Sequence, residues 1–176
     1  MASSCLALVG YRGTGKTTVA QYLARTLSWD WVDADVEIEL AAGKSIAAIF
    51  ADDGEKAFRD LEVEVVEQLL DRKDTIVALG GGAVLREETR KKLRTVQATV
   101  WLKASVETIE GRIFGDETTA GRRPNLTNAG GRNEIVTLLA ERTPIYTECA
   151  TLEVDTDSKA PAEIAEAILK KLGLAT

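Results

Sequence analysis

The chain has 176 residues, enough for one domain with a sizeable core, and its 45% hydrophobic and 28% charged residues are usual for a globular protein. Twenty-two Lys and Arg against 28 Asp and Glu give a formal net charge of −6, which argues against nucleic acid or an anionic membrane as a partner. The chain contains no histidine, which excludes a Ser-His-Asp or Cys-His nucleophile pair and histidine zinc ligands.

Two cysteines, Cys5 and Cys149, are too few for a thiolate metal cage and are not spaced as a redox pair, so we expect two ordinary reduced, buried thiols. No segment approaches the run of ~20 apolar residues that a membrane span needs. The N-terminal segment lacks the basic region and the apolar length of a signal peptide. We therefore expect a cytoplasmic protein.

Short apolar runs alternate along the chain with segments of helical periodicity. In chain order the pattern predicts a strand at 6–9, a helix at 16–27, the end of a strand at 31–32, helices at 45–50 and 55–72, a strand at 75–79, a charged helix at 86–94, a strand at 98–102, helices at 105–113 and 134–146, a strand at 152–154 and a helix at 161–172. Such alternation indicates an α/β fold with three αβα layers and a five-stranded parallel sheet. Ligands of such sheets bind beyond the carboxyl ends of the strands.

One stretch, 115–131, interrupts this pattern. It is rich in Gly, Thr, Asn and Arg and has no apolar periodicity. Because it is longer than an ordinary connection, we interpret it as part of a mobile lid, at about residues 112–126. We found no repeats and no linker, so the lid is expected to be inserted in a single domain that spans residues 1–176.

Residues 10–17, Gly-Tyr-Arg-Gly-Thr-Gly-Lys-Thr, match G-x-x-x-x-G-K-[ST] between a predicted strand and a predicted helix. In this motif backbone N–H groups surround phosphate oxygens at the positive end of the helix, Lys16 reaches the β- and γ-phosphates, and the Thr17 hydroxyl holds Mg²⁺. GTPases need D-x-x-G and N-K-x-D elements, but none of the 14 glycines has Asp three residues before it and no Asn precedes a Lys. The motif therefore predicts a nucleotide phosphate site and favours a kinase.

Asp33 and Asp35 stand two residues apart at a predicted strand end, so their side chains are expected to leave the same face. One carboxylate can serve Mg²⁺ through water while the other addresses the hydroxyl of an acceptor. Two solvated loop carboxylates are the alternative. The G-x-x-x-x-G-K-[ST] motif at 10–17 is a P-loop, and the strand that precedes it is expected to lie next to this one. That neighbour favours the functional interpretation.

Arg59 and Glu62 are spaced i and i+3 on a predicted helix, so Glu62 can hold Arg59 in position. For this motif alone an exposed ion pair of little energetic value is the better-supported interpretation. Arg142 is a second arginine of this kind. Two fixed arginines that converge on one pocket would bind a carboxylate bidentately.

Gly80, Gly81 and Gly82 follow a buried strand, which fits a backbone that a ligand approaches closely, with a plain loop as the alternative. Arg123 lies in the irregular stretch, where a lid arginine would neutralise charge on the transferred phosphate; solvated loop arginines are the alternative. Arg112 lies near this lid and has the side chain to stack on a base.

These residues, as an ordered set, resemble the shikimate kinases, within the nucleoside-monophosphate-kinase-like group of P-loop proteins. The resemblance covers nearly the whole chain. Its motifs lie at 10–17, 33–35, 43–46, 49–50, 54–55, 58–59 with Glu62, 80–82, 123–124, 141–142 with Pro144 and Tyr146, and 154–156. Arg12 departs from the family, which commonly has an apolar residue there, and Asn125 replaces a leucine.

The resemblance implies transfer of the γ-phosphate of ATP to the 3-hydroxyl of shikimate, with a monomeric enzyme and Mg²⁺ bound by Thr17 and Asp33. The ATP-binding residues it implies are Gly13, Thr14, Gly15, Lys16, Thr17, Thr18, Arg123 and Lys159, with the stretch around 159–161 beside the adenine. The shikimate-binding residues it implies are Asp35, Arg59, Gly81, Gly82 and Arg142. The catalytic residues are then Lys16, Asp35 and Arg123.

In-line transfer through a loose transition state depends mainly on positioning and charge neutralisation. We expect Lys16, Mg²⁺ and Arg123 to supply the charge, and Asp35 to orient the hydroxyl and take its proton late. Two alternatives stay open from the residues themselves. One is a gluconate kinase-like enzyme, whose acceptor is also a hydroxylated carboxylate, and the other is a nucleotide-binding regulatory module without catalysis.

Overall fold

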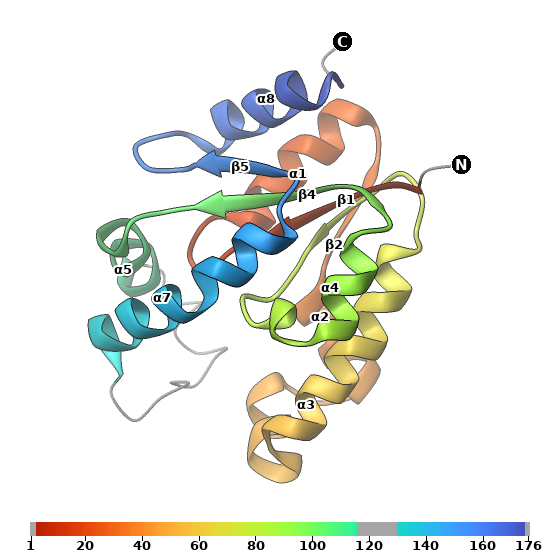
Figure 1. The fold of residues 1–176 in the computed structure, drawn as a ribbon. Coiled ribbons are helices and arrows are strands. Elements are labelled where there is room, and N and C mark those ends of the chain that lie inside the picture. Colours follow the sequence, from red (N-terminus) through yellow and green to blue (C-terminus); the bar gives the residue numbers. More distant parts are fainter. Residues whose placement is uncertain (1–2, 116–129, 175–176) are drawn as a thin grey trace.

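The computed structural model describes residues 3–115 and 130–174. In this part of the chain five parallel strands form one sheet in the order β2-β3-β1-β4-β5 (Figure 1). The strands are β1 (Ser3–Val9), β2 (Asp30–Asp33), β3 (Thr75–Ala78), β4 (Val96–Lys103) and β5 (Leu152–Asp155). The predicted three-layer α/β fold with a parallel sheet is confirmed.

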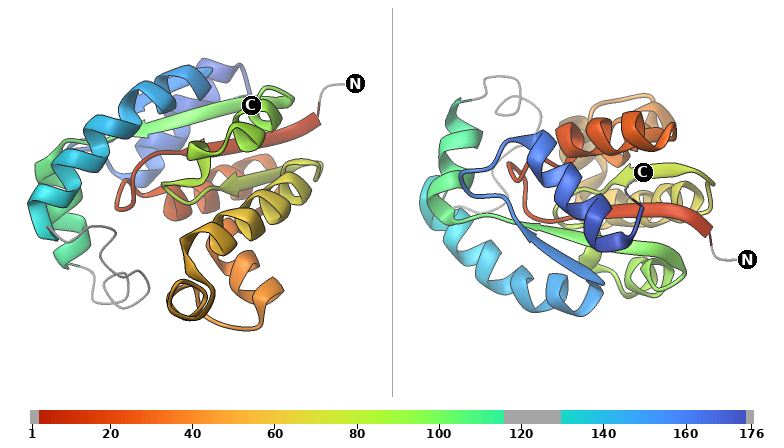
Figure 2. Two further views of the ribbon diagram at one scale, coloured as in Figure 1. Left: turned by 60° about the horizontal axis from the view of Figure 1, so that its bottom comes forward. Right: turned by 90° about the horizontal axis from the view of Figure 1, so that it is seen from above.

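Helices cover both faces of the sheet (Figures 1 and 2). Helices α1 and α8 lie on one side, and α3, α4 and α7 on the other. The helical elements of the described residues are α1 (Lys16–Leu27), α2 (Ala34–Ala42), α3 (Ile46–Leu70), η1 (Ala83–Leu85), α4 (Glu87–Leu93), α5 (Val106–Gly115), α7 (Gly131–Cys149) and α8 (Pro161–Leu172). Because the layers enclose the sheet, its central strands are buried on both faces, as the continuous apolar runs predicted.

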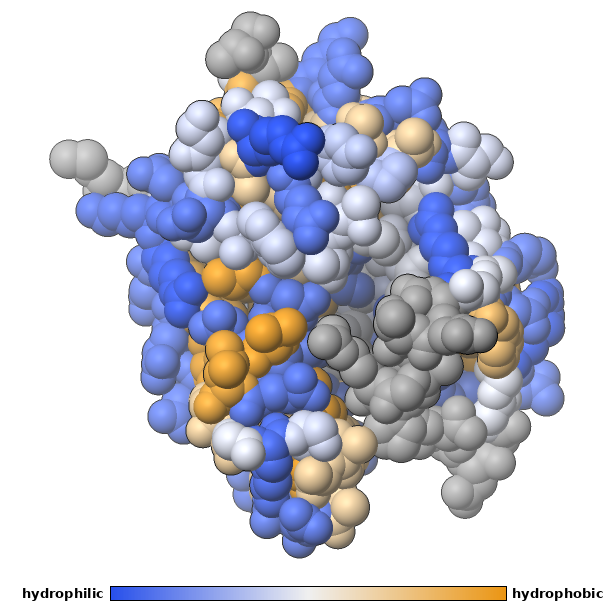
Figure 3. Space-filling view, turned by 180° about the vertical axis from the view of Figure 1, so that it is seen from behind, coloured by the Kyte–Doolittle hydropathy of each residue, from blue (hydrophilic) through white to orange (hydrophobic). Residues whose placement is uncertain are grey.

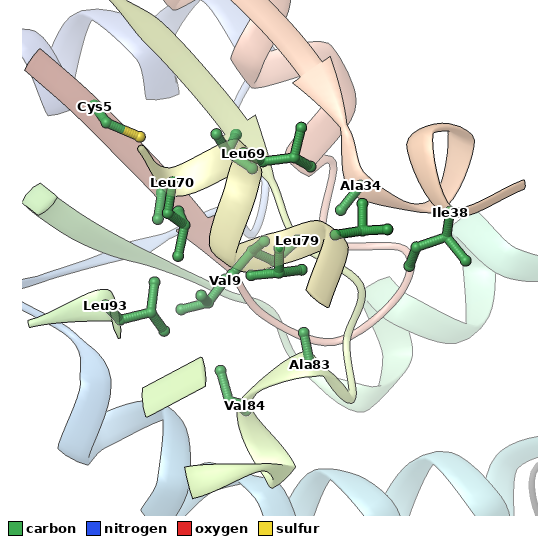
Figure 4. Packing of buried hydrophobic residues seen from close by; sticks show 14 of the residues in the cluster. Cys5, Val9, Ala34, Ile38, Leu69, Leu70, Leu79, Ala83, Val84 and Leu93 are labelled. Carbon is green, nitrogen blue, oxygen red and sulfur yellow. The ribbon is translucent and has the colours of Figure 1, made fainter. Parts of the chain in front are cut away.

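Side chains of β1 alternate between two separate parts of the core. Leu6 and Leu8 pack against α1 and α8, whereas Cys5, Ala7 and Val9 pack in a cluster with α3, α4 and α7. Figure 4 shows part of that second cluster, in which Leu69 and Leu70 of α3 lie close to β1. The period-two alternation of a strand thus supplies both helical layers from one short segment.

Most predicted elements are confirmed to within a few residues, but α2 was not predicted. Its residues 35–40 alternate between acidic and apolar side chains, which is the period of a strand rather than of a helix. Ile38 is buried, whereas Val36 and Leu40 are exposed. Figure 3 shows apolar side chains on the surface of this flank. The buried stripe of α2 is Ala34, Ile38 and the partly buried Ala42, and its two small alanines give too weak an apolar signal to stand out from the exposed Val36 and Leu40.

Two predicted helices, 45–50 and 55–72, form the single element α3, which is kinked where Gly54 has φ 85°. Both cysteines are free thiols, as expected, although Cys149 is only half-buried. Within residues 3–115 and 130–174, no helix has the length and apolar character to cross a bilayer. The expected lid at 112–126 lies mainly outside the described residues.

Candidate active site

A pocket of about 690 Å³ lies beyond the carboxyl ends of the strands. The P-loop, the ends of β2 and β3, α5 and the start of α8 contribute to it. Its described lining residues are 12–19, Asp33, Asp35, 78–81, Gly111, Arg112, Gly115, Lys159, Pro161 and Ile164. The topology therefore brings together motifs that lie up to 150 residues apart in the sequence, at the edge where parallel sheets bind ligands.

The P-loop connects β1 to α1, and Gly15 caps α1 with φ 89°. A side chain on Gly10 would meet the carbonyl oxygen of Leu102 at 2.6 Å, so the loop starts where only glycine fits. Thr14 is buried and its hydroxyl donates to the carbonyl of Tyr11 at 2.8 Å. The Lys16 Nζ donates to the carbonyls of Gly10 and Tyr11 at 2.7 and 2.9 Å, which holds the amine across the loop. The helix N-terminus and this amine make an anion site.

Thr17 and Asp33 join the P-loop to the end of β2. The Thr17 Oγ1 donates to Oδ2 of Asp33 at 2.7 Å, and Oδ1 of Asp33 accepts the backbone N–H of Asp35 at 2.9 Å. Asp33 is thus both the last residue of β2 and the N-cap of α2. A hydroxyl and a carboxylate side by side in the pocket are oxygen donors of the kind that Mg²⁺ prefers.

Asp33 and Asp35 both line the pocket, but the prediction that strand geometry directs their side chains from the same face is wrong. Asp35 lies in the first turn of α2, so it does not follow Asp33 along a strand. Its carboxylate reaches the pocket because the chain turns from β2 into a helix at Asp33. An acidic side chain is stabilising at this positive end of a helix.

The Arg59–Glu62 pair is buried, which corrects the interpretation of an exposed pair. The Arg59 Nη1 donates to Oε1 of Glu62 at 2.6 Å, and the side chains are 10% and 2% exposed. Burial raises the pKa of Glu62, against the lowering effect of the positive charges of Arg59 and Arg142. Glu62 and the face of Phe58, 5.1 Å from the guanidinium, hold Arg59 in one orientation.

Arg59 and Arg142 both approach the loop of Gly80, Gly81 and Gly82 that follows β3, called here the glycine loop. A Cβ on Gly82 would lie 2.4 Å from Nη2 of Arg59, and a Cβ on Gly81 would lie 3.4 Å from Nη1 of Arg142. The absence of side chains on Gly81 and Gly82 thus allows two guanidinium groups to approach the backbone. Arg59, Gly82 and Arg142 are not among the lining residues of the nucleotide pocket, but Gly81 is, so the glycine loop joins the arginines to that pocket.

Arg112 and Lys159 also line the pocket. Arg112 donates to the carbonyl of Gly13 at 3.3 Å and to the hydroxyl and carbonyl of Thr156, each at 3.2 Å. These bonds tie α5 to the P-loop and to the segment after β5. Arg123, Arg122 and Asn125 lie outside the described residues.

Three contacts around the site were not predicted. The Arg12 Nη2 donates to Oε1 of Glu134 at 2.8 Å, and Glu134 is fully buried at the start of α7. The Tyr146 hydroxyl donates to the carbonyl of Gly81 at 2.5 Å. Arg142 lies over the ring of the buried Tyr11, 5.7 Å from its centre. The spacing of Arg142 and Tyr146, one helical turn apart, was the one sequence signal for these contacts.

Comparison with known proteins identifies the family. A model described as shikimate kinase matches residues 12–173. The chain belongs to the shikimate kinase family. Shikimate kinases from Rhodopirellula baltica and Thermobifida fusca are 42% and 45% identical to it over 165 residues, which is 94% of this chain and 88% and 92% of theirs.

Solved shikimate kinases share the fold. The shikimate kinase from Acinetobacter baumannii, in complex with shikimate, matches with a TM-score of 0.90 and 34% identity over 97% of this chain and 93% of that chain. The shikimate kinase from Aquifex aeolicus matches with a TM-score of 0.76 and 30% identity over 96% of each chain. The resemblance seen in the ordered motifs is therefore confirmed at the level of family and fold.

Proposed function

We propose that this protein transfers the γ-phosphoryl group of ATP to the 3-hydroxyl of shikimate, giving shikimate 3-phosphate and ADP. The observation that carries the proposal is the pair of arginines, Arg59 and Arg142, at the glycine loop that borders the P-loop pocket. Guanidinium groups fixed in this way suit a carboxylate. Family membership supports shikimate as the acid that bears it.

The P-loop residues Gly13, Thr14, Gly15, Lys16, Thr17 and Thr18, together with Lys159, would bind ATP. The helix N-terminus binds phosphate through backbone N–H groups, and the Lys16 amine exchanges its loop carbonyls for phosphate oxygens. Arg112 and the segment that contains Lys159 would flank the base, since both line the same pocket as the P-loop.

Mg²⁺ would be bound by Thr17 and Asp33. No group of three or more His, Cys, Asp or Glu residues in the described part of the chain could hold a metal by itself. The adjacent hydroxyl and carboxylate of Thr17 and Asp33 fit an ion that keeps waters and takes its other ligands from nucleotide phosphates. When bound, Mg²⁺ would supply positive charge at the phosphates.

The acceptor would lie between the arginines and the P-loop, with Arg59, Arg142 and the backbone of Gly81 and Gly82 holding its carboxylate end. Asp35 would orient the hydroxyl and accept its proton. In-line transfer needs the nucleophile and phosphate aligned and the developing charge neutralised. Lys16 supplies charge from the described residues, and Arg123 of the expected lid is proposed to add more.

The decisive experiment measures ADP release in a coupled assay with shikimate, gluconate and no acid. We expect shikimate-dependent ADP formation. Turnover with gluconate alone would favour the gluconate kinase-like alternative, and ATP binding without acid-dependent turnover would favour a regulatory module. We also propose a single-domain, cytoplasmic monomer, which sedimentation velocity and cell fractionation test.

A further inference from the structure

Helix α7 contacts the glycine loop through two residues one turn apart, Arg142 and Tyr146. The Tyr146 side chain is fully buried, and its ring packs on Trp101 with a centroid separation of 5.6 Å. Its hydroxyl donates to the carbonyl oxygen of Gly81 at 2.5 Å. The Arg142 Nη1 lies 3.4 Å from the Cβ position of the same glycine. Helix α7 thus positions both the Arg142 guanidinium and the carbonyl of Gly81. These groups border the proposed binding site of the acceptor, called here the acceptor region.

The bond from Tyr146 determines the direction of the next N–H group. In a trans peptide the C=O and N–H bonds point in opposite directions across one plane. With the Gly81 carbonyl directed to Tyr146 on α7, the Gly82 N–H points away from α7. The Cβ position of Gly82 lies 2.4 Å from Nη2 of Arg59, so this residue adjoins the second guanidinium.

The loop does not fix this peptide by its own hydrogen bonds. Inside the loop the N–H of Ala83 donates to the Gly80 carbonyl and the N–H of Leu85 to the Gly82 carbonyl, each at 3.1 Å. Neither bond uses the Gly81 carbonyl oxygen or the Gly82 N–H, which together form the Gly81–Gly82 peptide group. The Tyr146 hydroxyl therefore acts on the one peptide that borders both arginines.

A peptide between two glycines can rotate at little steric cost. Gly82 has φ −99°. Rotation of the peptide by half a turn would bring that φ to about +80°, a region open to glycine. The rotated peptide would turn its carbonyl oxygen toward the acceptor region, where it would repel a carboxylate and remove a donor.

We propose that Tyr146 is a positioning residue for acceptor binding: its hydroxyl holds the Gly81–Gly82 peptide so that the N–H of Gly82, the glycine beside Arg59, donates to the anionic acceptor. This inference rests on the proposed function, because shikimate is the acid. It assigns Tyr146 no contact with either substrate. The hydroxyl acts only through the peptide that it orients.

The test compares Tyr146→Phe with Thr99→Val. Both changes remove a fully buried hydroxyl that donates to a backbone carbonyl, since Thr99 donates to Leu93 at 3.4 Å, on β4 away from the glycine loop. For Tyr146→Phe we expect the KM and the calorimetric Kd for shikimate to rise about three- to tenfold, the value of one hydrogen bond. The KM for ATP should stay unchanged. Thr99→Val should lower the melting temperature without changing the KM of either substrate.

A second measurement needs no variant. In ¹⁵N-labelled wild-type protein the Gly82 amide proton should move downfield when shikimate is added. If Tyr146→Phe does not fold, a wild-type Gly82 amide that stays in place still overturns the inference. The inference is overturned if the wild-type protein turns over shikimate but its Gly82 amide resonance stays in place. It is also overturned if Tyr146→Phe keeps the wild-type KM for shikimate. A wild-type protein without shikimate-dependent turnover overturns the proposed function, and this inference with it.

Discussion

Arg59 and Glu62 form a buried ion pair in which Nη1 of the guanidinium lies 2.6 Å from Oε1 of the carboxylate. Burial nevertheless raises the pKa of Glu62, because desolvation outweighs the positive charges of Arg59 and Arg142. A raised pKa means that ionised Glu62 is less favourable in the fold than in the unfolded chain. The pair therefore serves the orientation of Arg59 more than the stability of the protein.

The first prediction separates these two roles with Glu62→Gln. The amide has the shape of the carboxylate but cannot form the charged pair, so Arg59 loses its fixed orientation. We expect the KM for shikimate to rise about tenfold or more, as for a lost charged hydrogen bond. The unfolding free energy at neutral pH should fall by no more than about 3 kcal/mol, because the amide can keep a hydrogen bond to the buried guanidinium. Steady-state kinetics and urea denaturation measure the two quantities; a large loss of stability with an unchanged acid KM would contradict this assignment.

The second prediction concerns pH. A carboxyl group with a raised folded pKa adds stability below its unfolded pKa, and this contribution is lost as pH rises through the folded pKa. The unfolding free energy of the wild type minus that of Glu62→Gln should therefore fall as pH rises through the raised pKa of Glu62. The acid KM should move in the opposite sense to stability, rising in the wild type as pH falls and Glu62 becomes protonated.

Glu62→Gln is also the control for this pH dependence, because any titration of the shikimate carboxyl group affects the wild type and the variant alike. The KM for ATP measured over the same pH range should show no matching change in the wild type. Parallel acid KM profiles in the two proteins would show that Glu62 does not titrate as expected.

The third prediction tests Asp35, which lines the pocket from the first turn of α2. Asp35→Asn keeps the size of the side chain and removes the proton acceptor. Since general bases contribute at least about a hundredfold to turnover, we expect kcat to fall by that factor or more. Calorimetry should show ATP binding unchanged. A kcat close to that of the wild type would remove Asp35 from the proposed mechanism.

The prediction from sequence succeeded where a feature is local. The P-loop pattern at 10–17 and the apolar runs of the strands are continuous in the chain, so their structure follows from a few neighbouring residues. The prediction missed helix α2 because the acidic and apolar residues at 35–40 alternate with the period of a strand. Within 35–40 only Ile38 is buried. The burial of the Arg59–Glu62 pair depends on what packs around α3, which their spacing does not contain.

Contacts between distant residues were beyond the reach of sequence patterns. Tyr146 lies 65 residues from Gly81, and Glu134 lies 122 residues from Arg12. Each pair meets because α7 packs beside the P-loop and the glycine loop. A pattern of residue types within one helix gives no register for such packing.

The fourth prediction concerns the Arg12–Glu134 pair, in which the side chains are 14% and 0% exposed. Because Glu134 is fully buried, Arg12→Met would leave a buried carboxylate without this partner. We expect the unfolding free energy to fall by about 3 kcal/mol. Glu134→Gln in the Arg12→Met background should recover part of that loss, since it removes the uncompensated charge. Equal stability of the single and double variants would contradict an energetic coupling between these two residues.

The fifth prediction concerns Gly82, whose Cβ position lies 2.4 Å from Nη2 and 2.7 Å from Nη1 of Arg59. In Gly82→Ala the guanidinium must move, although its φ of −99° suits alanine and the backbone conformation is not strained. Since Glu62 holds Arg59 in the position that the methyl group would occupy, the displacement acts on the acid and not on the nucleotide. We expect the KM for shikimate to rise about tenfold or more with an unchanged KM for ATP.

Combination with Glu62→Gln makes the test of Gly82→Ala specific. Both changes displace the same guanidinium, so their effects on the acid KM should be far less than multiplicative in the double variant. Fully multiplicative effects would mean that Gly82 and Glu62 act on the acid by separate routes. In that case the close approach of Arg59 to the glycine loop would not be the reason that position 82 is a glycine.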